Sequence, residues 1–182
     1  MDLQEIKISG EDIYKGSILH VVRDEVRLPN GARSHREYCK HIGAVCIIPL
    51  LADGRVIMER QYRYAAGRTL LEIPAGKLNF VGEDPLEAAA RELREETGAV
   101  AGKYTCLGKM LGSPAILSET VHIYLAEDIS FSQTSPDEDE FIELEYIPLS
   151  ELYRMVMAGE IEDSKTQISV LKVWQMKNCE CK

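Results

Sequence analysis

The stretch that begins at Asp84 constrains the fold more than any other segment, because it carries a full set of helix start and stop signals. Asp84 fits the N-cap and Pro85 the first helical position. Glu87 completes a capping box, and Gly98 is the expected C-terminal stop. The pattern predicts a helix over residues 85–97.

One face of this predicted helix is apolar. Leu86, Ala90, Leu93 and Thr97 recur at helical spacing, so we expect them to pack inward.

The polar side of the same helix is unusual because Glu92, Glu95 and Glu96 share one surface. Like charges three or four residues apart cost an isolated helix about 0.2–0.5 kcal/mol per pair. They also lie in the C-terminal half, where the helix dipole disfavours negative charge. Two interpretations remain open, a solvated acidic face relieved by Arg91 and Arg94, or a divalent cation site. Carboxylates without nearby histidine or cysteine suit Mg²⁺ or Mn²⁺ better than zinc.

The distribution of charge supports the idea of local acidic sites. The chain has 182 residues, which fits one domain or one domain with an extension, and 21 basic against 30 acidic residues give a net charge of −9. Residues 81–96 hold six acids and two arginines, net −4, and residues 137–151 hold seven acids, net −7, so the remainder sums to +2. This balance argues against a nucleic-acid partner or binding to an anionic membrane, but a bound metal could still attract a phosphorylated small molecule.

Cysteine usage and the N-terminus predict a cytoplasmic protein. The five cysteines are odd in number and contain no Cys-x-x-Cys pair, so we interpret them as reduced thiols. The first residues show no basic region followed by an apolar run, and the apolar stretch 42–52 is too short to span a bilayer.

The remaining pattern predicts an α+β fold, in which a mixed β-sheet is packed by helices and preceded by an antiparallel β extension. Turn signals lie at Pro29-Asn30-Gly31 and at Asp53-Gly54, which predicts a hairpin. Further helices are expected at about 149–158 and 164–177. The predicted strands cover residues 17–28, 32–40, 43–51, 55–60, 70–75, 104–111, 120–126 and 141–147.

The residues around the helix carry a family resemblance. Gly76, Glu83 and the run Arg91-Glu92-Leu93-Arg94-Glu95-Glu96-Thr97-Gly98-Ala99 resemble the Nudix box, G-x5-E-x7-R-E-U-x-E-E-x-G-U, where U is a bulky aliphatic residue. Two positions depart from it. Six residues instead of five separate Gly76 from Glu83, and Ala99 replaces a larger aliphatic residue. The insertion lies in the loop before the helix, so it should leave the glutamates in place.

Segments outside the box are similar to the ADP-ribose pyrophosphatase branch of that family. They are Leu71-Glu72-Ile73-Pro74-Ala75-Gly76-Lys77, Gln61-Tyr62-Arg63, Ser113-Pro114 with Ser118-Glu119, and Asp137-Glu138-Asp139-Glu140-Phe141. One departure is Ala115, where the branch usually has glycine. The resemblance implies a Nudix fold for residues 41–182 and an N-terminal β extension, residues 1–40, that serves dimerisation and substrate contacts.

The resemblance also implies roles for individual residues. Glu92, Glu95, Glu96 and the Ala75 carbonyl would bind Mg²⁺, with Mn²⁺ as a possible substitute, and Arg91 would hold a glutamate in position. Glu83 would either pair with neighbouring charges or join the metal ligands. Glu138 matches the general base best and Glu140 next. Substrate contacts would come from Arg63, Glu72 and Glu119.

The implied activity is Mg²⁺-dependent hydrolysis of the pyrophosphate bond of ADP-ribose to AMP and ribose 5-phosphate, by a homodimer. Other nucleoside diphosphate sugars, such as ADP-glucose or GDP-mannose, are the alternative substrates. A non-catalytic nucleotide-sensing Nudix module is a further alternative, but such a module is expected to lose box glutamates, and all three are present. An acidic interaction protein without any ligand is the remaining alternative.

Overall fold

The computed structural model describes residues 2–132 and 141–179, which form two compact units. One unit combines Met1–Gly43 with the loop Leu111–Thr120, and the other combines Ala44–Met110 with Val121–Lys182. No helix in the described residues is long and apolar enough to cross a membrane.

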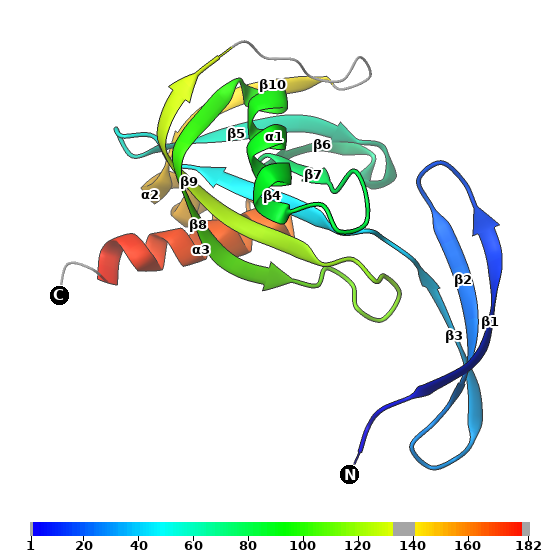
Figure 1. Ribbon diagram of the computed structural model, residues 1–182. Helices are drawn as coiled ribbons and strands as arrows, with labels where there is room; N and C mark the ends of the chain where they lie inside the picture. Colours follow the sequence, from blue (N-terminus) through cyan, green and yellow to red (C-terminus); the bar gives the residue numbers. More distant parts are fainter. Residues whose placement is uncertain (1, 133–140, 180–182) are drawn as a thin grey trace. The chain divides into compact units, whose positions relative to one another are not determined.

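The first unit contains a three-stranded antiparallel sheet in the order β1-β2-β3 (Figure 1). The strands are β1 (Ile6–Lys15), β2 (His20–Arg27) and β3 (Arg33–Cys39). Gly31 has a φ of 86° in the turn between β2 and β3, where a side chain would be strained, so the predicted turn is confirmed. The strand β1 was not among the predicted strands, because all its residues are exposed and the alternation of Ile6 and Ile8 with polar residues stops at Gly10.

The second unit contains a mixed four-stranded sheet in the order β7-β4-β9-β8. Its strands β4 (Ala44–Pro49) and β9 (Val121–Phe131) are parallel, whereas β7 (Ala75–Lys77) and β8 (Ala99–Met110) run antiparallel to their neighbours. A second sheet is antiparallel, in the order β10-β5-β6. It is formed by β10 (Ile142–Pro148), β5 (Arg55–Arg63) and β6 (Arg68–Glu72), and the short 3-10 helix η1 (Tyr64–Ala66) links the last two.

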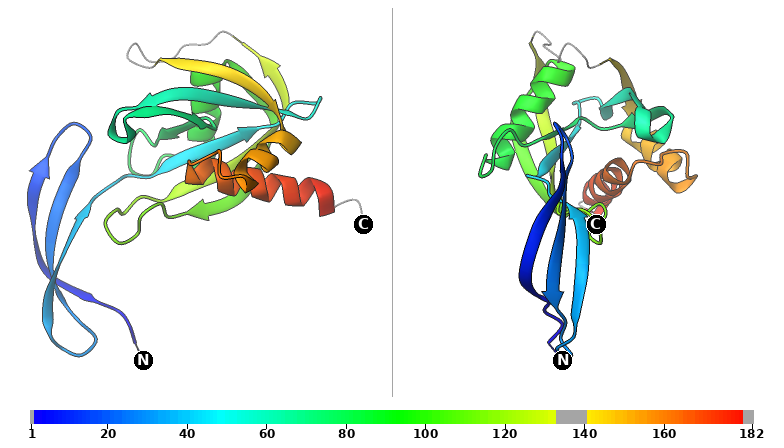
Figure 2. Two further views of the ribbon diagram at one scale, coloured as in Figure 1. Left: turned by 180° about the vertical axis from the view of Figure 1, so that it is seen from behind. Right: turned by 90° about the vertical axis from the view of Figure 1, so that its right-hand side faces the viewer.

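Three helices cover the sheets of this unit from opposite sides. Helix α1 (Pro85–Thr97) lies on one side, and α2 (Leu149–Met157) and α3 (Ser164–Cys179) lie on the other (Figure 2). The α+β architecture, with a mixed sheet between helices, is therefore confirmed.

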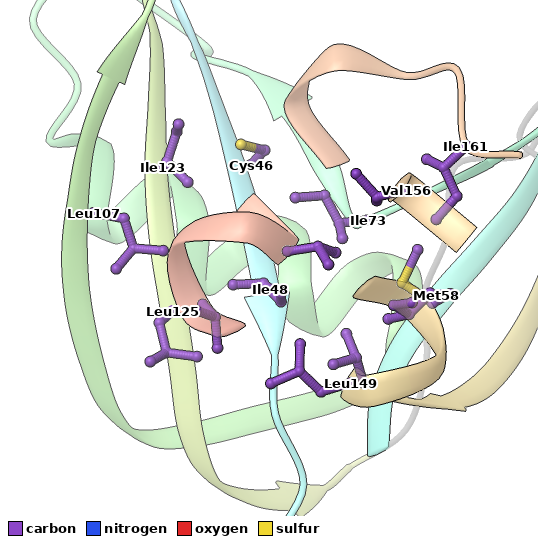
Figure 3. Packing of buried hydrophobic residues seen from close by; sticks show 14 of the residues in the cluster. Cys46, Ile48, Met58, Ile73, Leu107, Ile123, Leu125, Leu149, Val156 and Ile161 are labelled. Carbon is purple, nitrogen blue, oxygen red and sulfur yellow. The ribbon is translucent and has the colours of Figure 1, made fainter. Parts of the chain in front are cut away.

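Strand β4 explains why the sequence 43–51 is almost continuously apolar. Cys46 and Ile48 point into the core cluster under α2 and α3, which Figure 3 shows together with Ile73 and Met58. The alternate residues Val45 and Ile47 belong to the cluster under α1. Because both faces of the strand are buried, neither can be polar.

The Asp53-Gly54 turn forms, with Leu51 N–H donating to the Arg55 carbonyl at 2.8 Å, but it does not make a simple hairpin. Strand β4 enters the four-stranded sheet and β5 enters the other one. The tight turn thus lies at the point where the two sheets diverge.

The expected inward face of α1 is wrong at Leu86, which is 41% exposed, and Ala90 is only partly buried. The buried stripe consists of Ala88, Ala89, Leu93, Glu96 and Thr97. Two adjacent alanines let the helix approach the sheet closely, and this choice of face brings Glu96 to the buried side.

Candidate active site

Helix α1 begins where the sequence predicts, and its cap fixes the register of the glutamates. Asp84 Oδ1 accepts a hydrogen bond of 2.7 Å from Leu86 N–H and a longer one from Glu87 N–H. At the other end Gly98, at a φ of 71°, donates its N–H to the Arg94 carbonyl.

Arg91 lies at the centre of the acidic surface of α1. Its Nη1 donates to Glu92 Oε1 at 2.7 Å and to Glu95 Oε2 at 3.1 Å, while Nη2 lies 3.6 Å from Glu83 Oε1 and donates to the Lys77 carbonyl. Burial disfavours its charge, but the surrounding carboxylates, Glu92 foremost, outweigh this and raise the pKa of Arg91. The guanidinium is therefore bonded to Glu92 and Glu95 and lies near Glu83.

Strand β7 brings the chain against these glutamates. Ala75 N–H donates to Glu96 Oε2 at 3.1 Å, and only 7% of Glu96 is exposed. The Glu92 carboxylate lies directly against Gly76, so a β-carbon at that position would overlap it. The glycine of the motif is needed here for close approach.

The extra residue in the Lys77–Gly82 loop does not displace the motif. Asn79 N–H donates to Glu83 Oε2, and Phe80 and Val81 extend into solvent. Glu83 pairs with Arg91 and the loop backbone, which favours the first of its two predicted roles.

The donor set at α1 fits a hard divalent cation. Glu92, Glu95 and Glu96 lie on α1 beside the backbone of β7, where Gly76 has no side chain to displace the Glu92 carboxylate. Oxygen ligands of this kind suit Mg²⁺ or Mn²⁺. Within the described ranges, no three carboxylate, imidazole or thiolate groups already stand at ligating distance from one point. Glu92 and Glu95 are instead bonded to Arg91.

Arg63 and Glu72, both predicted to contact substrate, bind each other. Arg63 donates from Nε and Nη2 to the two oxygens of Glu72, at 2.8 and 2.9 Å. The bonds that Arg63 donates to Glu72 raise the pKa of Arg63, and the charges of Asp163 and Glu96 act in the same direction. Burial raises the pKa of Glu72, but Arg63 and Lys165 outweigh it and the net shift is downward.

The other three arginines of residues 54–70 have different partners. Arg55 pairs with Asp53, Arg60 with Glu145, and Arg68 with Glu162. Each of these three arginines is thus paired with an acidic residue, and among the residues that the structure describes Arg63 alone of the four contacts a predicted site residue.

Three predicted site residues are left, Glu119, Glu138 and Glu140. Glu119 belongs to the first unit, where its Oε1 lies 3.3 Å from His41 Nδ1. The predicted bases Glu138 and Glu140 lie outside the described residues.

Sequence reasoning missed three residues at the start of α3. Lys165 Nζ pairs with Glu72 and, at 3.0 Å, with Asp163, and Thr166 accepts from Ile73 N–H. The segment Asp163-Ser164-Lys165-Thr166 resembles a helix start, but nothing in its pattern reveals that it contacts residues 93 positions away.

A family model described as the NUDIX domain matches residues 40–168. The chain belongs to the Nudix family. A second model, for the N-terminal domain of nucleoside diphosphate sugar hydrolases, matches residues 5–38 of this Nudix protein. The family generally uses divalent metal ions, which agrees with the donor set on α1.

Relatives of this Nudix chain extend over nearly its whole length. An ADP-ribose pyrophosphatase of Bacillus subtilis is 40% identical, with 92% of this chain and 91% of the relative covered. A methanol dehydrogenase activator of Bacillus methanolicus is 38% identical, with coverages of 92% and 91%. A GDP-mannose pyrophosphatase of Pectobacterium atrosepticum is 33% identical, with 97% of each chain covered.

A solved structure described as an ADP compounds hydrolase has the same fold. It superposes with a TM-score of 0.82 over 98% of both chains, at 24% sequence identity.

Proposed function

We propose that this Nudix protein hydrolyses the pyrophosphate bond of ADP-ribose to AMP and ribose 5-phosphate, with Mg²⁺ as the activating ion and Mn²⁺ as a possible substitute. The observation that carries the proposal is the junction of α1 and β7, where Glu92 and Glu96 lie against Ala75 and Gly76. The similarity to an ADP-ribose pyrophosphatase over most of both chains supports the choice of substrate.

The ion would be bound by side chains of α1 and by a backbone carbonyl of β7. Glu92, Glu95, Glu96 and the Ala75 carbonyl are the proposed ligands, and Arg91 orients the glutamates through the bonds it donates. When bound, the ion would neutralise phosphate charge and lower the pKa of a coordinated water.

Arg63 would bind the substrate's phosphates. Glu72 fixes one edge of its guanidinium, and within the described residues both N–H groups of Nη1 remain available. A planar guanidinium held at one edge presents the other in a defined direction, which suits an anionic oxygen.

Glu138 is the proposed general base and Glu140 the second candidate, because a base is needed to accept a proton from the attacking water. Glu119 is proposed to contact substrate.

We further propose that residues 1–40 serve dimerisation and substrate contacts, and that residues 41–182 form the hydrolase domain. We propose that the protein acts as a cytoplasmic homodimer.

GDP-mannose is the second candidate substrate, since the Pectobacterium relative matches 97% of this chain. A non-catalytic nucleotide sensor is disfavoured because the box retains all three helix glutamates, two of them bonded to Arg91.

The test is turnover of ADP-ribose, ADP-glucose, GDP-mannose and NADH by the purified full chain, with Mg²⁺ and with a chelator. We expect the highest kcat/KM for ADP-ribose and none in chelator. Absence of metal-dependent turnover with all four substrates would refute the enzymatic proposal, and a preference for GDP-mannose would correct the substrate.

Glu96→Gln tests the site itself. The variant should fold, as judged by circular dichroism and thermal unfolding, and should lose turnover by at least about 100-fold, because the residue is a proposed ligand. Glu87→Gln, on the same helix but outside the acidic surface, is the matched control and should retain wild-type activity. An active Glu96→Gln enzyme would reject the ligand assignment.

A further inference from the structure

Ile73 lies where the chain passes from one sheet to the other. Strand β6 ends at Glu72 in the sheet β10-β5-β6, and β7 begins at Ala75 in the sheet β7-β4-β9-β8. Ile73 is 1% exposed, so its N–H must find a partner inside the protein. The partner is Thr166 Oγ1 of α3, at 3.0 Å.

Thr166 is held so that its hydroxyl can accept this bond. The residue is fully buried, and its Oγ1 donates to Asp163 Oδ2 at 2.6 Å, which turns a lone pair toward Ile73. Thr166 N–H donates to the same carboxylate oxygen at 2.9 Å. The first turn of α3 therefore presents an acceptor in a fixed direction.

A second connection joins the same turn to the preceding residue. Lys165 pairs with Asp163 at 3.0 Å and donates to the Glu72 carboxylate. Burial lowers the pKa of Lys165, but both carboxylates outweigh it and keep the ammonium charged. The Glu72 side chain and the Ile73 backbone N–H are thus both bonded to residues of α3.

The residues that follow, Pro74 and Ala75, are bonded to β4 and to α1. Ile47 N–H donates to the Pro74 carbonyl at 2.9 Å, and Ala75 pairs with Cys46 in the ladder of β4 and β7. Ala75 N–H donates to Glu96. Ile73 is bonded to Thr166 and lies two residues before Ala75, so a change in the position of Ile73 would shift the peptide between Pro74 and Ala75.

We propose that Thr166 is a positioning residue for the cation site, because through Ile73 it fixes the backbone that carries the Ala75 carbonyl. This inference rests on the proposed function, in which that carbonyl is a metal ligand. It adds a residue of α3 to a site otherwise built from α1 and β7.

If Thr166 only stabilised the fold, its loss would leave cation binding unchanged. The experiment must therefore measure both the stability of the protein and its affinity for the cation. Thr166→Val keeps the shape of the side chain and removes the acceptor, whereas Thr166→Ser keeps the acceptor. Ser169→Ala is the matched control, since it removes a buried hydroxyl of the same helix that donates to the Lys165 carbonyl and interacts with the Cys46 thiol, but does not bond Ile73.

Binding of Mn²⁺ to the full chain is measured by electron paramagnetic resonance of the free ion, alongside thermal unfolding and ADP-ribose kinetics. We expect Thr166→Val to weaken Mn²⁺ binding by about tenfold, as happens when a residue behind a metal ligand is lost. Thr166→Ser and Ser169→Ala should bind Mn²⁺ within twofold of wild type.

Equal Mn²⁺ affinity of Thr166→Val and wild type would overturn the inference while leaving the proposed function intact. Equal weakening in Thr166→Ser would also overturn it, because the acceptor would then not be the cause. A wild-type chain that binds no Mn²⁺ and shows no metal-dependent turnover would instead refute the proposed function. If Thr166→Val does not fold, Asp163→Ala decides, since it removes the group that orients the hydroxyl and should weaken Mn²⁺ binding in the same direction.

Discussion

Arg63 of β5 and Glu72 of β6 form a two-point pair in which the carboxylate is almost completely buried and the guanidinium is partly exposed. The carboxylate also accepts from Lys165, so it has cationic partners on two sides. Glu72 is thus better placed to hold Arg63 than to bind a substrate itself.

Glu72→Gln should lower the free energy of unfolding by about 2 kcal/mol at neutral pH, because charge-assisted bonds to both cations are weakened. The pKa of Glu72 is lowered in the folded protein, so its contribution is present above the unfolded-state pKa of about 4.3 and is lost as the pH falls through the folded-state value. Denaturant unfolding of wild type and variant across this range measures the difference, which should shrink toward acid pH.

The matched control is Glu162→Gln, which breaks the exposed pair with Arg68 and should cost less than about 1 kcal/mol. A difference between wild type and Glu72→Gln that stays constant with pH would contradict the role assigned to the ionised carboxylate.

Gly76→Ala should impair cation binding with little effect on the fold. A β-carbon here overlaps the Glu92 carboxylate, which is the end of a flexible side chain and can move away. We expect Mn²⁺ affinity to fall by about tenfold with an unchanged unfolding midpoint.

A double-mutant cycle tests the cause of this loss. In a Glu92→Gln background, Gly76→Ala should add much less than it does alone, because contacting residues couple. Fully additive losses would show that the alanine acts through something other than Glu92.

Arg91→Met should reduce kcat by about 10- to 100-fold, since Glu92 and Glu95 lose the group that orients them. Arg91→Lys should rescue only in part, because an ammonium cannot reproduce the planar set of bonds. The comparison is Arg94→Met, an exposed arginine on the same helix, and steady-state kinetics at saturating Mg²⁺ provides the measurement. Wild-type rates in Arg91→Met would show that the orientation is unnecessary.

Glu138→Gln should lower kcat by about 100-fold or more while Mn²⁺ binding stays unchanged, as expected for loss of a general base. Glu140→Gln should have a smaller effect, and Glu143→Gln, exposed on β10, should have none. A larger loss in Glu140→Gln than in Glu138→Gln would reverse the two assignments.

Sequence reasoning predicted the helix 85–97 to the residue, because its boundaries are encoded locally by Asp84, Pro85 and Gly98. The family resemblance implied that Arg91 holds a glutamate, and Glu95 lies four positions further along the same helix, where side chains are neighbours. These are short-range relationships, which a spacing rule captures.

Long-range relationships were not accessible in the same way. The pair of Lys165 with Glu72 and the bond from Ile73 to Thr166 depend on how α3 packs on the sheets, and no local pattern encodes that. Likewise, Asp53-Gly54 encodes the turn but not that β4 and β5 enter separate sheets. The inward face of α1 was misjudged because Leu86 was weighted above the smaller Ala88 and Ala89.

The loop between β7 and α1 separates two structural features that a motif pattern links by a fixed spacing, the position of Gly76 and the register of the helix. Gly76 is positioned by β4 and by Glu92, whereas the helix register is set afresh at Asp84. Phe80 and Val81 are exposed, so this loop can hold an additional residue without disturbing buried side chains. A search that demands five residues between the glycine and the first glutamate would pass over this chain, although the strand and the helix on either side of the loop still meet.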